Sequence, residues 1–261
     1  LNPELVFPKT NIRGGICYFL WDKVYDNEKS LIKVVTHQIN TEPVTVYRTL
    51  KSEHSDTFIR HGIAISIVNK VSNYTGFECF SKLISSRKPF GLDGKFINDY
   101  RFKSSKNGLN NPIVCYGKGR KVGYIEKEEI KVKKEWIDKF KVFTPYANNI
   151  GTELNDDNLN SFIGEPGTVS TETYLVIGAD LLLDFVSAEN ITKYFKTKFL
   201  RFQLSLAKAS QHATAKTYQF VPLQNFTSTS DIDWSKSVAD IDRQLYTKYG
   251  LSEVEVAFIE G

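Results

Sequence analysis

An unbroken apolar run close to the start of the chain is the feature that most limits how this sequence can fold. Residues 15–21 read "GICYFLW" and stop at Asp22. A strand with one face in water alternates apolar and polar residues, and this run does not alternate. We therefore expect 15–21 to form an inner strand that is covered on both faces.

The next segments continue this pattern into a hairpin and a helix. Residues 31–39, "LIKVVTHQI", are strand-like and follow a polar connection, which predicts an antiparallel hairpin with 15–21. Residues 44–50 alternate and form a third strand or the exit from the hairpin. Residues 56–74 carry apolar side chains at helical spacing, with Asp56 as the expected N-cap.

From about 85 to 125 the chain changes to short segments separated by Gly, Asn, Ser and Pro. We expect loops here, with brief strands at "PIVCYG" and "VGYIE". The mixed charges of 127–140 predict a solvated helix, 141–147 and 171–180 predict strands, and 147–171 predicts a long loop.

The C-terminal part has helical periodicity. Ser187 is the expected cap of a helix whose apolar stripe comprises Ile191, Tyr194, Phe195, Phe199, Phe202 and Leu206. A short helix follows and ends at Gly250, and Ser252 with Glu255 forms a capping box for a last helix. Together these elements predict the α+β class.

The composition agrees with a folded domain. Of 261 residues, 41% are hydrophobic and 13% aromatic, which allows a sizeable core. No apolar stretch reaches the length of about 18 residues that a membrane span requires. Cys17, Cys79 and Cys115 are widely spaced, so we expect buried free thiols in a reducing cytoplasm. The absence of Met and the opening "LNPELVFPK" indicate a fragment of a longer protein.

Positive charge is concentrated between residues 87 and 121. This basic window contains two acids, Asp93 and Asp99, although the whole chain carries a net charge of +4. Such a concentration indicates a polyanionic partner. The nine cations of the window are Arg87, Lys88, Lys95, Arg101, Lys103, Lys106, Lys118, Arg120 and Lys121.

Aromatic residues are interleaved with these cations, a combination typical of nucleic-acid surfaces. They are Phe90, Phe96, Tyr100, Phe102 and Tyr116. Each single aromatic residue is better explained as core, whereas the cations as a group favour a nucleic-acid surface. The alternative is a protein-interaction module whose basic face meets an acidic partner.

Catalytic and metal-binding patterns are missing from the sequence. The four histidines have no metal-ligand spacing, and no P-loop, G-x-S-x-G or G-x-G-x-x-G motif occurs. Glu129 and Lys131, with Asp99 upstream, match the E-x-K pattern of some nucleases, but such triplets arise by chance in a charged chain. We expect no catalytic residue and no metal site here, with a free-standing nuclease as the weaker alternative.

Several segments, taken in order, resemble adenine-N6 DNA methyltransferases of type II restriction–modification systems. The likeness is to Eco57I-like enzymes with a TaqI-like C-terminal specificity domain. It covers essentially the whole chain and rests on "NIRGGICYFLWDK", "FIRHGIAISIVNKV", "SSRKPFGL", "GYIEKEEI", "KVFTPYA", "STETYLVIG", "YFKTKFLRFQLSLAKASQHA", "FVPLQNFT" and "DIDRQLYTKYGLSEVEVAFIE".

The resemblance implies that residues 1–51 are the last hairpin of a truncated catalytic domain. Such a domain binds S-adenosylmethionine, but the family's F-x-G-x-G and Asn-Pro-Pro-Tyr motifs are absent here. The fragment is therefore expected to hold no cofactor and to be inactive alone, with the catalytic domain upstream in the same chain. An aromatic residue of this hairpin, Phe19 or Tyr18, would stack on the flipped adenine.

By the same resemblance, 52–225 is the DNA target-recognition domain and 226–261 forms C-terminal helices. Its partner would be double-stranded DNA, in the cytoplasm and away from membranes. The family often has Arg-Thr-Asn where this chain has Asp93-Gly94-Lys95. The expected DNA-binding residues are Arg87, Lys88, Phe90, Lys95, Arg101, Lys103, Lys118, Arg120 and Lys121.

Overall fold

The computed structural model has a mixed α/β fold, and the expected α+β class is confirmed. Its described part contains three small sheets and five α-helices. The structure describes residues 6–9, 16–26, 31–37, 42–50, 57–148, 150, 159–208 and 212–261. Every helix in these ranges is too short or too polar to cross a lipid bilayer.

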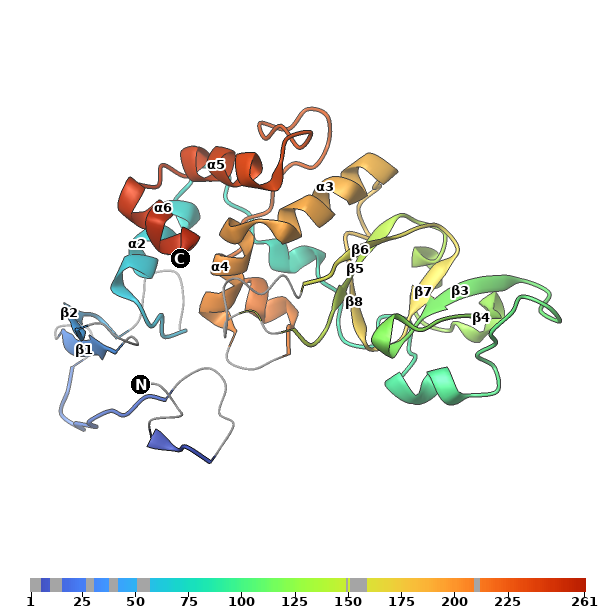
Figure 1. Cartoon of the computed structure of the whole chain (residues 1–261), viewed down its shortest axis with the longest axis horizontal. Helices are drawn as coiled ribbons and strands as arrows, with labels where there is room; N and C mark the ends of the chain where they lie inside the picture. Colours follow the sequence, from blue (N-terminus) through green and yellow to red (C-terminus); the bar gives the residue numbers. More distant parts are fainter. Residues whose placement is uncertain are drawn as a thin grey trace.

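The regular elements follow one another as short strands and helices. The strands are β1 (Ile32–Thr36), β2 (Val44–Arg48), β3 (Pro112–Tyr116), β4 (Val122–Glu126), β5 (Lys141–Pro145), β6 (Phe162–Gly164), β7 (Thr168–Ser170) and β8 (Tyr174–Ile177). The helices are α2 (Gly62–Ser72), α3 (Phe185–Lys196), α4 (Lys198–Ala207), α5 (Val238–Lys248) and α6 (Glu253–Glu260). In Figure 1 the β1–β2 hairpin lies at one end, the helices lie in the middle, and β3 and β4 lie at the other end.

The expected inner strand at 15–21 is wrong. Residues 16–22 form no regular secondary structure, and the side chains from Tyr18 to Trp21 are between 73% and 95% exposed. A strand needs a neighbour for its backbone hydrogen bonds. The hairpin in fact pairs β1 with β2, with Ile32 opposite Arg48, so the run has no neighbouring strand in the described part. The expected third strand at 44–50 is confirmed as β2.

The hairpin is attached to the chain before α2 by Arg48. Its guanidinium donates to the Ile59 carbonyl and lies 4.5 Å from the centroid of the Phe58 ring. Helix α2 begins after His61 and is therefore shorter than the expected 56–74. The side chain of His61, at the N-cap, makes no capping hydrogen bond. Asp56, the expected cap, lies outside the described residues.

The sheet β6–β5–β8 is buried on both faces and separates two cores. Successive residues of a strand point to opposite faces. Val142 of β5 therefore packs in a helical core, which also contains Phe80, Phe195 and Leu245. Phe143 packs in a sheet core with Phe90, Ile125 and Trp136.

Strand β5 also carries Lys141, whose side chain is fully buried. Its ammonium group donates to the carbonyls of Ile137 (3.2 Å), Lys139 (2.8 Å) and Glu165 (3.3 Å). Burial lowers its pKa to about 7, because the interior disfavours the charge. These bonds connect β5 to the chain that precedes it and to the turn after β6.

Two expected segments differ from the structure between 127 and 171. Residues 127–140 form no solvated helix but two short 3₁₀ turns, Lys127–Glu129 and Lys134–Trp136, and the apolar side chains at Ile130 and Ile137 are buried. Lys133 has a φ of 50°, which interrupts a right-handed helix. The expected loop at 147–171 contains the strands β6 and β7. Each is only three residues long, which is too short to show an alternation of apolar and polar residues. The strands expected at "PIVCYG", "VGYIE", 141–147 and 171–180 are confirmed.

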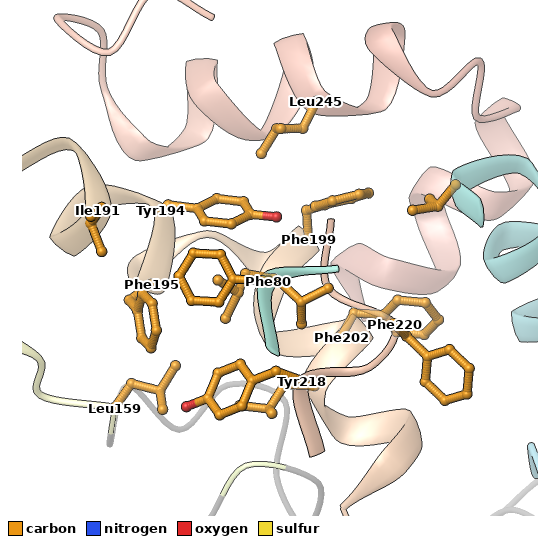
Figure 2. Close-up of a cluster of buried hydrophobic side chains, with 14 of the residues drawn as sticks. Phe80, Leu159, Ile191, Tyr194, Phe195, Phe199, Phe202, Tyr218, Phe220 and Leu245 are labelled. Atoms are coloured by element: carbon orange, nitrogen blue, oxygen red, sulfur yellow. The ribbon is translucent and has the colours of Figure 1, made fainter. Parts of the chain in front are cut away.

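The predicted apolar stripe after 185 is confirmed as core, but it belongs to two helices. Asp184 caps α3 by accepting from the Ser187 amide, and Thr197 caps α4 by accepting from the Leu200 amide. Figure 2 shows Tyr194 and Phe195 of this stripe beside Phe80, whose ring lies 5.9 Å from that of Tyr194 and 5.6 Å from that of Phe195. Ser187 is therefore inside the first turn instead of at the cap.

Helices α5 and α6 complete the helical core. Ile241, Leu245 and Ile259 pack in the same core as α2, α3 and α4. Gly250 has a φ of 61° after α5, and the Ser252–Glu255 capping box at α6 is confirmed. Of the cysteines, Cys115 is buried, Cys79 is half-buried and Cys17 is exposed, so the expected burial fails for Cys17.

Glu255 ties α6 to α2. Its carboxylate accepts from Lys70 Nζ (2.6 Å), Ser66 Oγ (2.7 Å) and the Ser252 amide (2.7 Å), and the residue is 4% exposed. Burial alone would raise the pKa of Glu255, but the bonds from Lys70, Ser252 and Ser66 outweigh it and lower the pKa to about 2.

We predict that Glu255→Gln lowers the free energy of unfolding at neutral pH by about 2 kcal/mol, because the buried network loses its negative charge and one of its two acceptor oxygens. Since the folded-state pKa is depressed, this contribution is present above a pH of about 5 and is lost as the pH falls toward about 2. Urea denaturation at several pH values checks this. Glu253→Gln, an exposed change on the same turn, is the control. An equal loss of stability at acidic and neutral pH would contradict the assigned role.

Candidate nucleic-acid interface

Five cations of the basic window surround strand β4, which is the edge strand of the sheet β4–β3–β7. All five side chains are exposed. Three lie in the turn before β4, and the other two lie on a segment that packs along β4. We call this set the β4-edge patch; its members are Lys103, Lys106, Lys118, Arg120 and Lys121.

The turn between β3 and β4 contains three of these cations, Lys118, Arg120 and Lys121, within four consecutive residues. The Gly117 amide donates to the Lys121 carbonyl at 2.8 Å, which closes the turn. Gly119 and Arg120 both have positive φ, 69° and 59°. This backbone conformation is costly for arginine and is often found at functional sites.

The segment 97–106 is fastened to the outer side of β4 by backbone and side-chain contacts. Lys103 and Tyr124 exchange two backbone hydrogen bonds of 2.9 Å and 2.8 Å. Lys106 Nζ lies 5.4 Å from the centroid of the Tyr124 ring, and Lys121 Nζ lies 5.5 Å from that of Phe102. Lysines from different parts of the chain are thereby held near one strand.

Two glycines make this close packing possible. A Cβ at Gly123 would lie 2.3 Å from two ring atoms of Phe102, and a Cβ at Gly117 would lie 2.2 Å from Ile97 Cγ2. These distances are shorter than real Cβ contacts, so each neighbour would have to move. The hairpin can therefore accept the segment 97–106 because it has no side chain at either position.

The β4-edge patch has a positive field that acidic neighbours do not cancel. No carboxylate oxygen of the described residues lies within 4.0 Å of a charged nitrogen of its five members. Exposed cations of one sign, held close together, attract polyanions over about 10 Å at moderate salt. The patch is therefore suited to phosphate groups.

Arg87 and Lys88 lie outside the β4-edge patch, and their positive charges are partly neutralised by one carboxylate. Glu172 Oε2 is 3.0 Å from the Arg87 guanidinium and 3.8 Å from Lys88 Nζ. The Arg87 guanidinium also lies 5.1 Å from the centroid of the Tyr146 ring, and Lys88 has a φ of 58°. Both side chains remain about half exposed, so they can still meet a ligand.

Arg101 is engaged in an ion-pair network. It donates to both carboxylate oxygens of Asp99, at 2.9 Å and 2.8 Å, and to Glu129 at 2.8 Å. The hydrogen bonds from Arg101 lower the pKa of Asp99 to about 2. Asp99 and Glu129, the acids of the nuclease alternative, therefore both bind the Arg101 guanidinium. In the described part, no group of three His, Cys, Asp or Glu residues could hold a metal ion.

The aromatic residues of the basic window divide into core and surface. Phe90 and Phe96 are buried in the sheet core, and Phe90, which the sequence suggested as a DNA contact, is only 1% exposed. Tyr100 is 81% exposed. Lys95, another expected contact, is exposed in the 3₁₀ turn Gly94–Asn98.

Sequence reasoning missed two features of this region. Lys106 was counted in the basic window but not among the expected contacts, because its place beside Tyr124 depends on a long-range packing. Asp93 caps the turn Gly94–Asn98 by accepting from the Lys95 and Phe96 amides. The preference for Asp at the N-cap was the available signal.

Tyr18 and Phe19, the expected stacking residues, belong to no helix or strand and are 73% and 80% exposed. They are not brought together with the β4-edge patch by any contact in the described part. In Figure 1 the N-terminal region lies at the end of the molecule opposite to β3 and β4.

No protein-family model matches this chain, and no curated protein matches it.

We predict that Gly123→Ala lowers the free energy of unfolding by about 1–3 kcal/mol, because the added methyl group displaces the Phe102 ring from β4. Urea denaturation measures this change. Gly62→Ala is the matched control, since its added Cβ meets nothing closer than 3.4 Å. Equal stability of the wild type and Gly123→Ala would show that the segment 97–106 is not packed on β4 as described.

Proposed function

We propose that this chain is the DNA-recognition part of an adenine-N6 DNA methyltransferase of a type II restriction–modification system. The β4-edge patch would contact the phosphate backbone of duplex DNA, and neighbouring loops would read base edges. The observation that supports this most is the set of five exposed cations that surround one edge strand without a carboxylate partner in the described part. Phosphate contacts of this kind fix the register of a protein on DNA.

The methylation chemistry would belong to an upstream domain of the same chain. The sheets of the described part have two or three strands each, and none is the doubly wound sheet on which such enzymes bind S-adenosylmethionine. The motifs for that cofactor and for catalysis are also absent from the sequence. The residues present therefore do not fit the cofactor, and residues 1–261 would carry out no catalytic step.

The exposed apolar run from Tyr18 to Trp21 fits the same proposal. Large apolar side chains that lie together on a surface mark an interaction site. In the proposed enzyme, this run would be covered by the upstream domain. Phe19 or Tyr18 would then be in position to stack on the flipped adenine.

The β4-edge patch can be tested by removing charge without disturbing the core. We predict that Lys103→Gln with Lys106→Gln weakens binding to duplex DNA and reduces the slope of log K against log salt by about 1.8, since two phosphate contacts are lost. The wild-type slope would be about −4.5 if all five cations meet phosphates. Fluorescence anisotropy with a labelled duplex at several salt concentrations measures both values.

The control for that experiment is Lys33→Gln with Lys216→Gln, which removes the same charge from exposed positions outside the patch. It is expected to leave the slope unchanged. Absence of duplex binding by the wild type at low salt would contradict the proposal and favour the protein-interaction module. Metal-dependent cleavage that is abolished by Glu129→Gln would favour the nuclease.

Arg87 and Lys88 provide a separate test of base reading. We predict that Arg87→Ala with Lys88→Ala weakens binding to the cognate duplex by about tenfold, equivalent to about 1.4 kcal/mol. The shared partner Glu172 reduces the net charge that the pair presents, so the salt slope changes less than for the patch variant. Unchanged affinity for the cognate duplex would remove this loop from the interface.

A further inference from the structure

Tyr100 is an exposed aromatic residue in a tight turn of the basic window. Its side chain is 81% exposed, more than that of any other tyrosine in the described part. It is the first central residue of the turn from Asp99 to Phe102, in which the Phe102 amide donates to the Asp99 carbonyl at 3.0 Å. Single exposed rings are common on protein surfaces, so the surroundings of Tyr100 decide what it can bind.

Hydrogen bonds on both sides of Tyr100 fix the backbone of this turn. Asp99 Oδ1 accepts from the Arg101 amide at 3.0 Å, which forms a second, side-chain turn across Tyr100. Three residues further on, Lys103 and Tyr124 exchange the two backbone hydrogen bonds that fasten the segment to β4. The backbone of Tyr100 is therefore held in place, and only the two side-chain torsions of its ring would have to be fixed when a ligand binds.

The charges around the turn are favourable for a polyanion. The guanidinium of Arg101 lies 5.9 Å from the centroid of the Tyr100 ring, within the range of a cation–π contact. Asp99 and Glu129 both bind this guanidinium, so these two carboxylates are partly neutralised. Lys103, a member of the β4-edge patch, follows Tyr100 by three residues, so the two Cα atoms are at most about 11 Å apart.

A rigid ring next to exposed cations matches the chemistry of an unpaired base. Proteins that bind nucleotides outside a double helix combine cations for the phosphates with aromatic rings on which the bases stack. A base in an intact duplex is paired at its edge and stacked on both faces. A base whose partner has been flipped out has lost its pairing and can be contacted more easily.

We propose that Tyr100 stacks on an unpaired base of the bound DNA, while Lys103 and the other members of the β4-edge patch hold the adjacent phosphates. In the proposed enzyme, this base is the one that loses its partner when the target adenine is flipped. The inference rests on the proposed function and extends it, because Tyr100 is outside the set of expected DNA-binding residues.

The test measures binding of the whole chain to two labelled duplexes by fluorescence anisotropy. The duplexes have the same sequence, but in one of them a single base lies opposite an abasic site and is therefore unpaired. The wild type is expected to bind the duplex with the unpaired base at least about fivefold more tightly, since it gains stacking on one base. Equal affinity for the two duplexes would overturn the proposal.

Variants assign this preference to the ring. Tyr100→Leu is expected to bind both duplexes with similar affinity, because it keeps an apolar side chain but loses the ring. Tyr100→Phe is expected to keep the preference, and both variants are expected to keep the melting temperature because Tyr100 is exposed. Tyr47→Leu removes another exposed ring, on β2, and is the matched control. A preference that survives in Tyr100→Leu would overturn the proposal.

Salt dependence separates the stacking contact from the proposed function. Tyr100→Leu removes no charge, so the slope of log K against log salt is expected to stay at the wild-type value. Absence of binding to both duplexes by the wild type at low salt would overturn the proposed function and the stacking contact together. Salt-dependent binding of the paired duplex, with the same affinities in the wild type and Tyr100→Leu for both duplexes, would overturn the stacking contact alone.

Discussion

The structure depends most on the burial of β5 between two cores. Because side chains of a strand alternate in direction, Val142 and Phe143 contribute to different cores although they are neighbours in the chain. The Lys141 ammonium adds three hydrogen bonds to backbone carbonyls at the start of this strand. This sheet thereby joins the helical part to the β4–β3–β7 part (Figure 1).

The β4-edge patch shows how packing turns a local excess of charge into a surface. The basic window has nine cations, but Arg87, Lys88 and Arg101 have acidic partners in the structure. The patch retains its field because the segment 97–106 packs on β4, which Gly117 and Gly123 permit. The sequence does not distinguish the cations that have acidic partners from those of the patch, because a count of charged residues does not show which of them form ion pairs.

The short 3₁₀ turn Lys118–Arg120 between β3 and β4 ends at Arg120, a member of the β4-edge patch. Its two consecutive residues with positive φ, Gly119 and Arg120, fix the direction of this arginine. A rigid turn at the boundary between two parts of a protein is a favourable place for a ligand contact, because little side-chain entropy is lost on binding.

The sequence by itself determined the α+β class, most strands after residue 110, the apolar stripe of α3 and α4, the Gly250 stop and the Ser252–Glu255 capping box. These features depend on periodicity and on caps, which act over a few residues. Only the tertiary structure decided that 16–22 forms no strand, that 127–140 forms no helix, that Phe90 is core, and which cations have acidic partners. Those outcomes depend on pairings between residues that are distant in sequence, because strand neighbours, buried faces and ion-pair partners are chosen by the packing of the whole chain.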